Sequence, residues 1–329
     1  MKNAIFTAVV LLLTTPFIWA QDTVTQFANT ITAKELQEQL YVYASDYFAG
    51  RDTGKKGQKI AVDFLRQYYE NLGIPPAKGT TSYFQKMLLN IRGDLVETEN
   101  VVAILPGTEK KEEYLILSAH LDHVGIRNGE VYNGADDNGS GTVALMEIAA
   151  AFKAAADQGH GPKRSIIFLH MTGEEKGLLG SKYYTEHPLY PLKNTIADLN
   201  VDMIGRLDPK RESDNENYIY LIGSDRLSQE LHDISERINK KYTQLELDYT
   251  FNAEDDPNRF YQRSDHYNFA KKNIPIIFYF NGTHDDYHRA TDTADKIRYP
   301  LLEKRVKLIF HTAWELANRE NRPKQNSNS

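Results

Sequence analysis

Histidine, aspartate and glutamate residues occur together in five short stretches of the chain, each at or near the end of an apolar segment. These stretches are residues 119–123, 134–141, 173–175 and 201–203, and the loop that carries His284 and His288. If the apolar segments are neighbouring parallel strands, their carboxyl ends meet at one edge of a sheet, where such folds bind ligands. We therefore predict that these side chains gather in a single site.

Each stretch taken alone also has a purely structural explanation. Asp136 and Asp137 precede a predicted helix, and carboxylates stabilise the amino end of a helix. The pair Glu174-Glu175 is compatible with a solvated loop. Asp202 is different, because it interrupts an apolar run and an unpaired buried carboxylate is costly. The occurrence of all five stretches in one chain is what favours a functional site.

The absence of cysteine restricts the chemistry of that site. Without cysteine the chain has no disulfide, no thiolate ligand and no catalytic thiol, so any metal must be held by His, Asp and Glu. Two histidines with three or four carboxylates suit zinc in an open, catalytic site. The set exceeds the needs of one ion, and it suits two zinc ions about 3.5–4 Å apart that share a carboxylate. Cobalt and manganese accept similar ligands.

Hydrophobic periodicity predicts the elements that position these residues. The predicted strands are residues 101–105, 114–118, 165–170, 199–204, 218–222 and 275–280, and the predicted helices are residues 32–47, 57–72, 141–155, 228–242 and 301–318. Strands that alternate with helices indicate an α/β fold, a three-layer sandwich in which a mostly parallel mixed sheet carries helices on both faces.

The first residues have the features of an exported protein. Lys2 is followed by a largely apolar stretch, Ala4 to Ala20, and we predict a signal peptide at residues 1–20. A membrane anchor is the alternative, but the stretch is short for a span and no cluster of charges follows it. The predicted location of the mature protein is the periplasm or the external medium, with no membrane attachment after cleavage.

Residues 21–329 are expected to form one domain, because a single core can extend over roughly 250–300 residues. Residues 21–95 are expected to be a helical part packed on the edge of the sheet, in which Gly50-Arg51-Asp52-Thr53-Gly54 interrupts the helical pattern. Residues 319–329 form a polar tail. The formal net charge of −6 gives no reason to expect nucleic acid as a partner.

Taken in chain order, the motifs resemble those of the M28 family of zinc aminopeptidases. The resemblance covers about residues 95–318. Its motifs are His120-Leu121-Asp122, Gly134-Ala135-Asp136-Asp137-Asn138-Gly139-Ser140-Gly141, Gly173-Glu174-Glu175-Lys176-Gly177-Leu178-Leu179-Gly180-Ser181, Asp202-Met203 and His288-Arg289-Ala290-Thr291-Asp292-Thr293. It implies a zinc-exopeptidase-like fold and two zinc ions per chain.

The resemblance also implies a role for each metal ligand. Asp137 would bridge the two ions. His120 and Asp202 would complete one site, and Glu175 and His288 the other. His284 lies four residues before His288 and could compete as the ligand, but residues 289–293 match the family pattern and favour His288.

Three further residues receive roles from the same resemblance. Glu174 would be the general base, and Asp122 would accept a hydrogen bond from His120 and so fix its ring. Tyr261 would donate to the oxyanion, although its loop lacks the cysteine pair found in some secreted relatives. The peptide bond between Asp137 and Asn138 is expected to be cis.

The predicted activity is the hydrolysis of N-terminal residues from peptides that have a free N-terminus. Zinc lowers the pKa of a bound water to about 7, and Glu174 would take the water proton and later give it to the departing amine. Two alternatives remain open: a glutaminyl-peptide cyclotransferase of the same fold, and a non-catalytic binding member of the family. The sequence does not indicate the preferred first residue or the oligomeric state.

Overall fold

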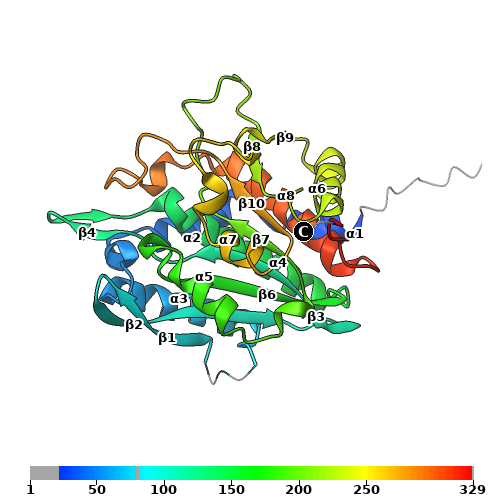
Figure 1. The fold of residues 1–329 in the computed structure, drawn as a ribbon, viewed down its shortest axis with the longest axis horizontal. Coiled ribbons are helices and arrows are strands. Elements are labelled where there is room, and N and C mark those ends of the chain that lie inside the picture. Colours follow the sequence, from blue (N-terminus) through cyan, green and yellow to red (C-terminus); the bar gives the residue numbers. More distant parts are fainter. Residues whose placement is uncertain (1–21, 79, 81, 328–329) are drawn as a thin grey trace, which may run out of the picture.

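The computed structural model describes residues 22–327 except 79 and 81. Its central element is an eight-stranded mixed sheet in the order β1-β2-β6-β3-β7-β10-β8-β9 (Figure 1). The strands β6, β3, β7 and β10 are parallel neighbours. Antiparallel pairs join β1 to β2, β2 to β6 and β8 to β10, and β9 pairs parallel with β8. The predicted mostly parallel mixed sheet is therefore confirmed. The predicted signal peptide lies outside the described residues.

The sheet strands are β1 (Phe84–Ile91), β2 (Asp94–Leu105), β3 (Lys110–His120), β6 (Arg164–Met171), β7 (Thr195–Val201), β8 (Tyr218–Ile222), β9 (Glu246–Asp248) and β10 (Ile276–Phe280). A separate hairpin consists of β4 (Gly125–Arg127) and β5 (Glu130–Tyr132). All residues of β6, β7 and β10 are buried, as expected for parallel strands that are covered on both faces.

The helices are α1 (Thr23–Ala28), α2 (Ala33–Tyr43), α3 (Lys56–Leu72), α4 (Gly141–Asp157), α5 (Leu179–Glu186), α6 (Gln229–Tyr242), α7 (His266–Ala270) and α8 (Tyr299–Asn318). Side chains from α1 to α4, α6 and α8 join one face of the sheet in the main hydrophobic core. Tyr184 of α5 and Phe269 of α7 belong to a second core on the other face. The molecule is thus a sandwich of three layers (Figure 1).

The structure differs from the predicted elements in several places, among them β1 and β7. Residues 84–91 form strand β1, which the sequence did not predict, so the part before residue 95 is not entirely helical. Strand β7 ends at Val201, whereas a strand was predicted over residues 199–204. Asp202 therefore does not interrupt a strand but is the first residue beyond its carboxyl end. This position still takes it to the edge of the sheet where the other stretches end.

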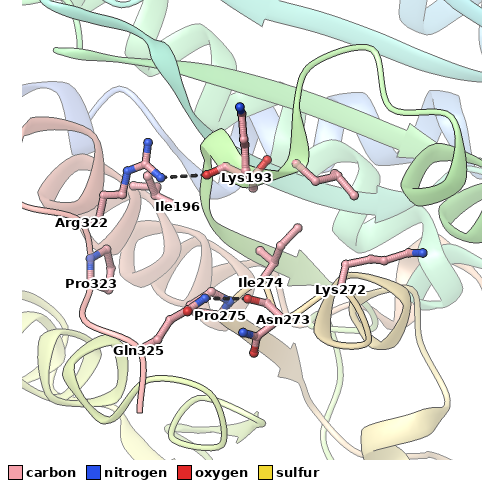
Figure 2. Close-up of a pocket in the computed structure, with 11 residues that line it drawn as sticks. Lys193, Ile196, Lys272, Asn273, Ile274, Pro275, Arg322, Pro323 and Gln325 are labelled. Atoms are coloured by element: carbon pink, nitrogen blue, oxygen red, sulfur yellow. Dashed lines mark hydrogen bonds between the residues drawn. The ribbon is translucent and has the colours of Figure 1, made fainter. Parts of the chain in front are cut away.

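A cavity of about 520 Å³ lies at the opposite end of β7 and β10. The residues after α8 run along it, where Arg322 donates a hydrogen bond to the main-chain oxygen of Lys193 and Gln325 donates to that of Asn273 (Figure 2). Thr195, the first residue of β7, lines this cavity. It is therefore separate from the site at the carboxyl ends of these strands. Within the described residues, none of the helices has both the length and the apolarity needed to span a membrane.

Candidate metal centre

The ends of the parallel strands place the predicted ligands. His120 is the last residue of β3, and Asp202 directly follows β7. Glu175 lies in a helical turn, η3 (Glu174–Lys176), shortly after β6. Asp137 lies in the segment η2 (Ala135–Ser140) that leads into α4, and His288 lies in the loop after β10. Four segments that are distant in sequence therefore converge with the end of β3 at one edge of the sheet.

Asp137 contacts both halves of the cluster through different oxygens. Its Oδ1 atom lies 3.3 Å from Nε2 of His120, which in turn lies 3.2 Å from Oδ1 of Asp202. Its Oδ2 atom lies 3.0 Å from Nε2 of His288, which is 3.1 Å from Oε2 of Glu175. The carboxylate is thus shared between a His120–Asp202 pair and a Glu175–His288 pair.

His123 is a further member of the second half, although no role was predicted for it. Its Nδ1 atom lies 2.9 Å from Oε1 of Glu175 and 3.6 Å from Oδ2 of Asp137. It is completely buried, and it follows His120 by only three residues. This spacing within a loop that already carries a predicted ligand is the signal that could have identified it.

The residues of the cluster fit a bound cation. Two sets have ligand atoms within 4.8 Å of one another: His120, Asp137 and Asp202, and His123, Asp137 and Glu175. Buried atoms of His123, Asp137 and Glu175 have no hydrogen-bond partner among the described residues. Because buried polar atoms are nearly always paired, and because imidazole and carboxylate are zinc ligands, a metal ion suits this donor set.

His284 lies apart from both halves. Its Nε2 atom is 3.2 Å from Oδ2 of Asp136, the residue before Asp137, and the other oxygen of Asp136 accepts a 2.6 Å hydrogen bond from the main chain of Gly205. His284 therefore contacts the loop that carries Asp137 rather than the ligand atoms themselves.

The carboxylate of Asp122 is not the hydrogen-bond partner of His120 that we expected. Nδ1 of His120 lies 3.1 Å from the main-chain oxygen of Asp122 but 3.9 Å from its nearest carboxylate oxygen. The carboxylate instead accepts hydrogen bonds from the main chain of Glu174 at 3.2 Å and from the Thr53 hydroxyl at 2.7 Å. It is held by these two donors, so it supports Glu174 directly and His120 only through the main chain.

Glu174 lines a small cavity together with other residues of the cluster, and its walls combine carboxylates with aromatic side chains. The cavity has a volume of about 30 Å³ and is lined by Asp137, Glu174, Asp202, Met203, Phe260, Arg263, Phe278, Phe280, Thr283 and Tyr287. Burial raises the pKa of Glu174 well above its ordinary value, and the neighbouring carboxylates of Asp202 and Glu175 raise it further. A carboxyl group with a raised pKa beside metal ligands is suited to proton transfer.

Tyr287 rather than Tyr261 lies at this cavity. Tyr287 lines it and stacks on His288 with ring centroids 3.9 Å apart. Burial, followed by the charges of Asp137 and Glu175, raises the pKa of Tyr287, so the phenol keeps its proton. Tyr261 is not among the described residues that line the cavity, and its ring packs beneath Arg226 at 3.9 Å. The position of Tyr287 directly before a predicted ligand could have identified it from the sequence.

The peptide bond between Asp137 and Asn138 is cis, which confirms the expectation from the sequence. Two hydrogen bonds hold the chain on either side of this bond. The side-chain amide of Asn138 donates to the main-chain oxygen of Val201 at 2.8 Å. The main-chain N–H of Asp137 donates to the carboxylate of Asp292 at 3.1 Å. The segment that carries Asp137 is thus fastened both to the end of β7 and to the loop of His288.

Known proteins resemble this chain in sequence and in fold. A probable leucine aminopeptidase of Arthroderma otae is 28% identical over 270 residues, which are 78% of this chain and 70% of the relative. The solved zinc aminopeptidase of Bacillus subtilis has a TM-score of 0.67 at 16% identity, covering 89% and 97% of the two chains. The solved glutaminyl cyclase of Porphyromonas gingivalis has a TM-score of 0.70 at 18% identity, covering 86% and 98%.

One of these solved structures is an aminopeptidase and the other a glutaminyl cyclase, and both resemble this chain to nearly the same degree. They support the α/β fold but do not decide between the two activities. The decisive comparison is with a family model, that of peptidase family M28, which matches residues 100–313. That region contains every histidine and carboxylate of the metal centre described above. Because the match spans more than half of the sequence, the chain belongs to peptidase family M28.

Proposed function

We propose that this protein is a zinc-dependent aminopeptidase that removes N-terminal residues from peptides. The observation that carries the proposal is the Asp137 carboxylate, which is shared between two groups of ligands while Glu174 lines the adjoining cavity. The relatives named as leucine aminopeptidases support the same activity. The site would hold two zinc ions, one at His120 and Asp202 and the other at Glu175 and His288.

When bound, zinc would supply a Lewis acid and an acidified water molecule. The side chains of the protein would then divide the remaining work. Glu174 would accept the water proton and return it to the departing amine. The carboxylates around the cavity would attract the cationic α-amine of the substrate, and the phenylalanine walls would receive the first side chain and exclude water.

We assign to Tyr287 the donor role that the sequence suggested for Tyr261. Its hydroxyl would donate a hydrogen bond to the carbonyl oxygen as negative charge develops there. The support for this assignment is its place in the cavity that also contains Glu174, together with its stacking on His288.

The test is a comparison of three substrates at equal zinc content. A leucyl anilide with a free amine should be hydrolysed, its N-acetylated form should not, and a glutaminyl peptide should be trimmed rather than cyclised. Glu174→Gln should keep its zinc and lose about 10²–10⁴-fold in kcat, the usual contribution of a general base. Metal analysis should give two zinc ions per chain.

Other outcomes would lead to a different function. Cyclisation of the glutaminyl peptide with one zinc per chain would favour the cyclotransferase. Cleavage of the blocked substrate would exclude an aminopeptidase, and zinc binding without turnover of any substrate would favour a non-catalytic member. Near-normal turnover by Glu174→Gln would remove Glu174 from the mechanism.

We also propose that the protein is exported and cleaved after Ala20. The support is the sequence pattern of Lys2 followed by the apolar stretch to Ala20. N-terminal sequencing of the protein recovered outside the cytoplasm should begin at Gln21.

A further inference from the structure

The segment Gly50–Gly54 contacts the metal centre, although it lies outside the region matched by the family model. It connects η1 (Asp46–Arg51) to α3 and is the segment that interrupts the helical pattern of the sequence. Two of its side chains, Arg51 and Thr53, are 0% and 3% exposed. A buried arginine and a buried threonine in a connecting segment need polar partners. Apart from the main-chain oxygen of Tyr43, which accepts from Arg51 at 3.2 Å, those partners are found in the loop after β3.

Arg51 joins several parts of that loop through one guanidinium group. Its Nε atom donates to the main-chain oxygen of Leu121 at 3.0 Å. Nη1 donates to the main-chain oxygen of Asn133 at 2.7 Å, and Nη2 donates to that of Gly134 at 2.9 Å. The rigid fork of arginine is suited to holding several acceptors in a fixed geometry. Arg51 thus fixes both ends of the loop that runs from His120 toward Asp137.

Thr53 acts on the same loop through a side chain. Its hydroxyl donates to Oδ2 of Asp122 at 2.7 Å, while Oδ1 of Asp122 accepts the main-chain N–H of Glu174 at 3.2 Å. Asp122 is completely buried. The two donors together determine the orientation of a carboxylate that lies between the His120 loop and the proposed general base.

The surrounding backbone leaves little room for another arrangement. A Cβ atom on Gly50 would lie 2.5 Å from the main-chain oxygens of Gly125 and Tyr132, and Gly50 has a φ of +66°. Asp52 forms a 2.6 Å ion pair with Lys176, which directly follows Glu175. The segment therefore contacts the hairpin after His120 and also the turn that carries both glutamates.

We propose that Arg51 and Thr53 are positioning residues of the metal centre. Arg51 sets the path of the loop between His120 and Asp137, and Thr53 orients Asp122 so that the Glu174 main chain is held in place. The inference rests on the proposed function for its effect on catalysis, but its effect on metal binding can be measured without any substrate. Under this proposal the segment Gly50–Gly54, which precedes the region matched by the family model, takes a direct part in the site.

Thr53 provides the sharper test, because two substitutions separate its hydroxyl from its bulk. Thr53→Val keeps the shape and loses the hydrogen bond, whereas Thr53→Ser keeps the hydroxyl and loses a methyl group. We expect Thr53→Val to lose about 10–100-fold in zinc affinity or in kcat, the usual effect of removing a partner behind the ligands. KM should change little, and Thr53→Ser should stay within a few-fold of the parent protein.

The readouts are competition between the metal-free protein and a chromogenic zinc chelator, steady-state kinetics on the leucyl anilide, and thermal unfolding. Thr312→Val is the matched control, because the Thr312 hydroxyl is also buried and donates to the main-chain oxygen of Leu308 at 2.9 Å within α8. It should lose neither zinc affinity nor kcat.

Each outcome decides the proposal. Equal losses in Thr53→Val and Thr312→Val, or a Thr53→Ser variant as impaired as Thr53→Val, would assign Thr53 to packing and overturn it. Parent-like zinc affinity and kcat in Thr53→Val would overturn it as well. If the parent protein hydrolyses no free-amine substrate, the proposed function fails, and the zinc titration alone then decides the positioning role.

Discussion

Glu174 and Glu175 are neighbours in the chain, yet the fold gives their carboxylates opposite environments. Burial and then the charges of nearby carboxylates raise the pKa of Glu174 well above its ordinary value. For Glu175, burial and Asp137 act in the same direction, but contacts with His123 and His288 outweigh them and lower its pKa to about 2. This divergence in pKa is consistent with the proposed roles of Glu174 as proton carrier and Glu175 as anionic ligand.

At the residue scale, the two histidines of the loop after β10 can be distinguished by substitution. His288→Ala should retain only one tightly bound zinc and lose more than about 100-fold in kcat, exceeding the usual loss for a partner behind the ligands. His284→Ala should keep two zinc ions, because His284 contacts Asp136 and not the ligand atoms. Metal analysis after dialysis, with kinetics on the same samples, makes the comparison. The reverse pattern would make His284 the ligand.

The sequence predicts which residues approach the site better than it predicts their contacts. His120, Asp137, Glu175, Asp202 and His288 could be proposed as ligands because their motifs resemble those of the M28 family. The partner of His120 could not be predicted, because the carboxylate of Asp122 is occupied by Thr53 from a segment 69 positions earlier. The choice between Tyr261 and Tyr287 likewise depends on how two loops pack around the cavity.

At the scale of elements, strand β1 shows why some strands cannot be recognised from their residue pattern. Gln85, Met87 and Leu89 point toward the protein, while Leu88 is 54% exposed. The buried Gln85 accepts a hydrogen bond from Asn100 and donates one to the main-chain oxygen of His187. A polar residue on the inner face and an apolar one on the outer face hide the period of two that identifies a strand. Strands β8 and β10 have no such exception and could be predicted, and β6 could be predicted from the apolar run at residues 166–169.

Glu147, in helix α4, should make the stability of the folded protein depend on pH. Its side chain lies among the core residues of α4, and burial, followed by the charge of Glu35, raises its pKa to about 7 from 4.5. Below pH 4.5 the group is protonated in both the folded and the unfolded protein. Between pH 4.5 and about 7, the unfolded chain has lost this proton while the folded protein still holds it. The free energy of unfolding therefore falls as the pH rises toward 7.

Glu147→Gln should remove this dependence. The free energy of unfolding of the variant should equal that of the parent protein near pH 4.5 and exceed it by about 1–3 kcal/mol at pH 8. Urea unfolding at several pH values between 4.5 and 8 measures the difference. Glu38→Gln, on the exposed face of α2, is the control and should change the free energy of unfolding by less than about 1 kcal/mol. Parallel pH curves for Glu147→Gln and the parent protein would contradict the expectation.

At the scale of the whole molecule, the metal centre joins the sheet to loops from most of the chain. Its proposed ligands come from β3, η2, η3, and the segments after β7 and β10. Among the described residues they include several buried carboxylates at one edge of the sheet. Cations bound there would oppose the repulsion between these groups and tie the loops together.

Metal removal should therefore destabilise the protein as well as inactivate it. A ligand at 100 times its Kd stabilises the folded state by about 2.7 kcal/mol, which corresponds to a fall in Tm of about 4 °C for a chain of this length when the ligand is removed. Calorimetry with a chelator, and again after zinc is restored, measures the change. If the Tm is unchanged in protein shown to be free of metal, the repulsion between the carboxylates must be offset by other groups of the protein itself.

The place of Arg51 has a consequence for dividing the chain into fragments. A fragment cut at the limits of the family match would contain every proposed ligand and the proposed base, and by sequence comparison it would look complete. It would nevertheless lack the guanidinium that joins the oxygens of Leu121, Asn133 and Gly134. Inactivity of such a fragment would therefore say nothing about the chemistry of its ligands.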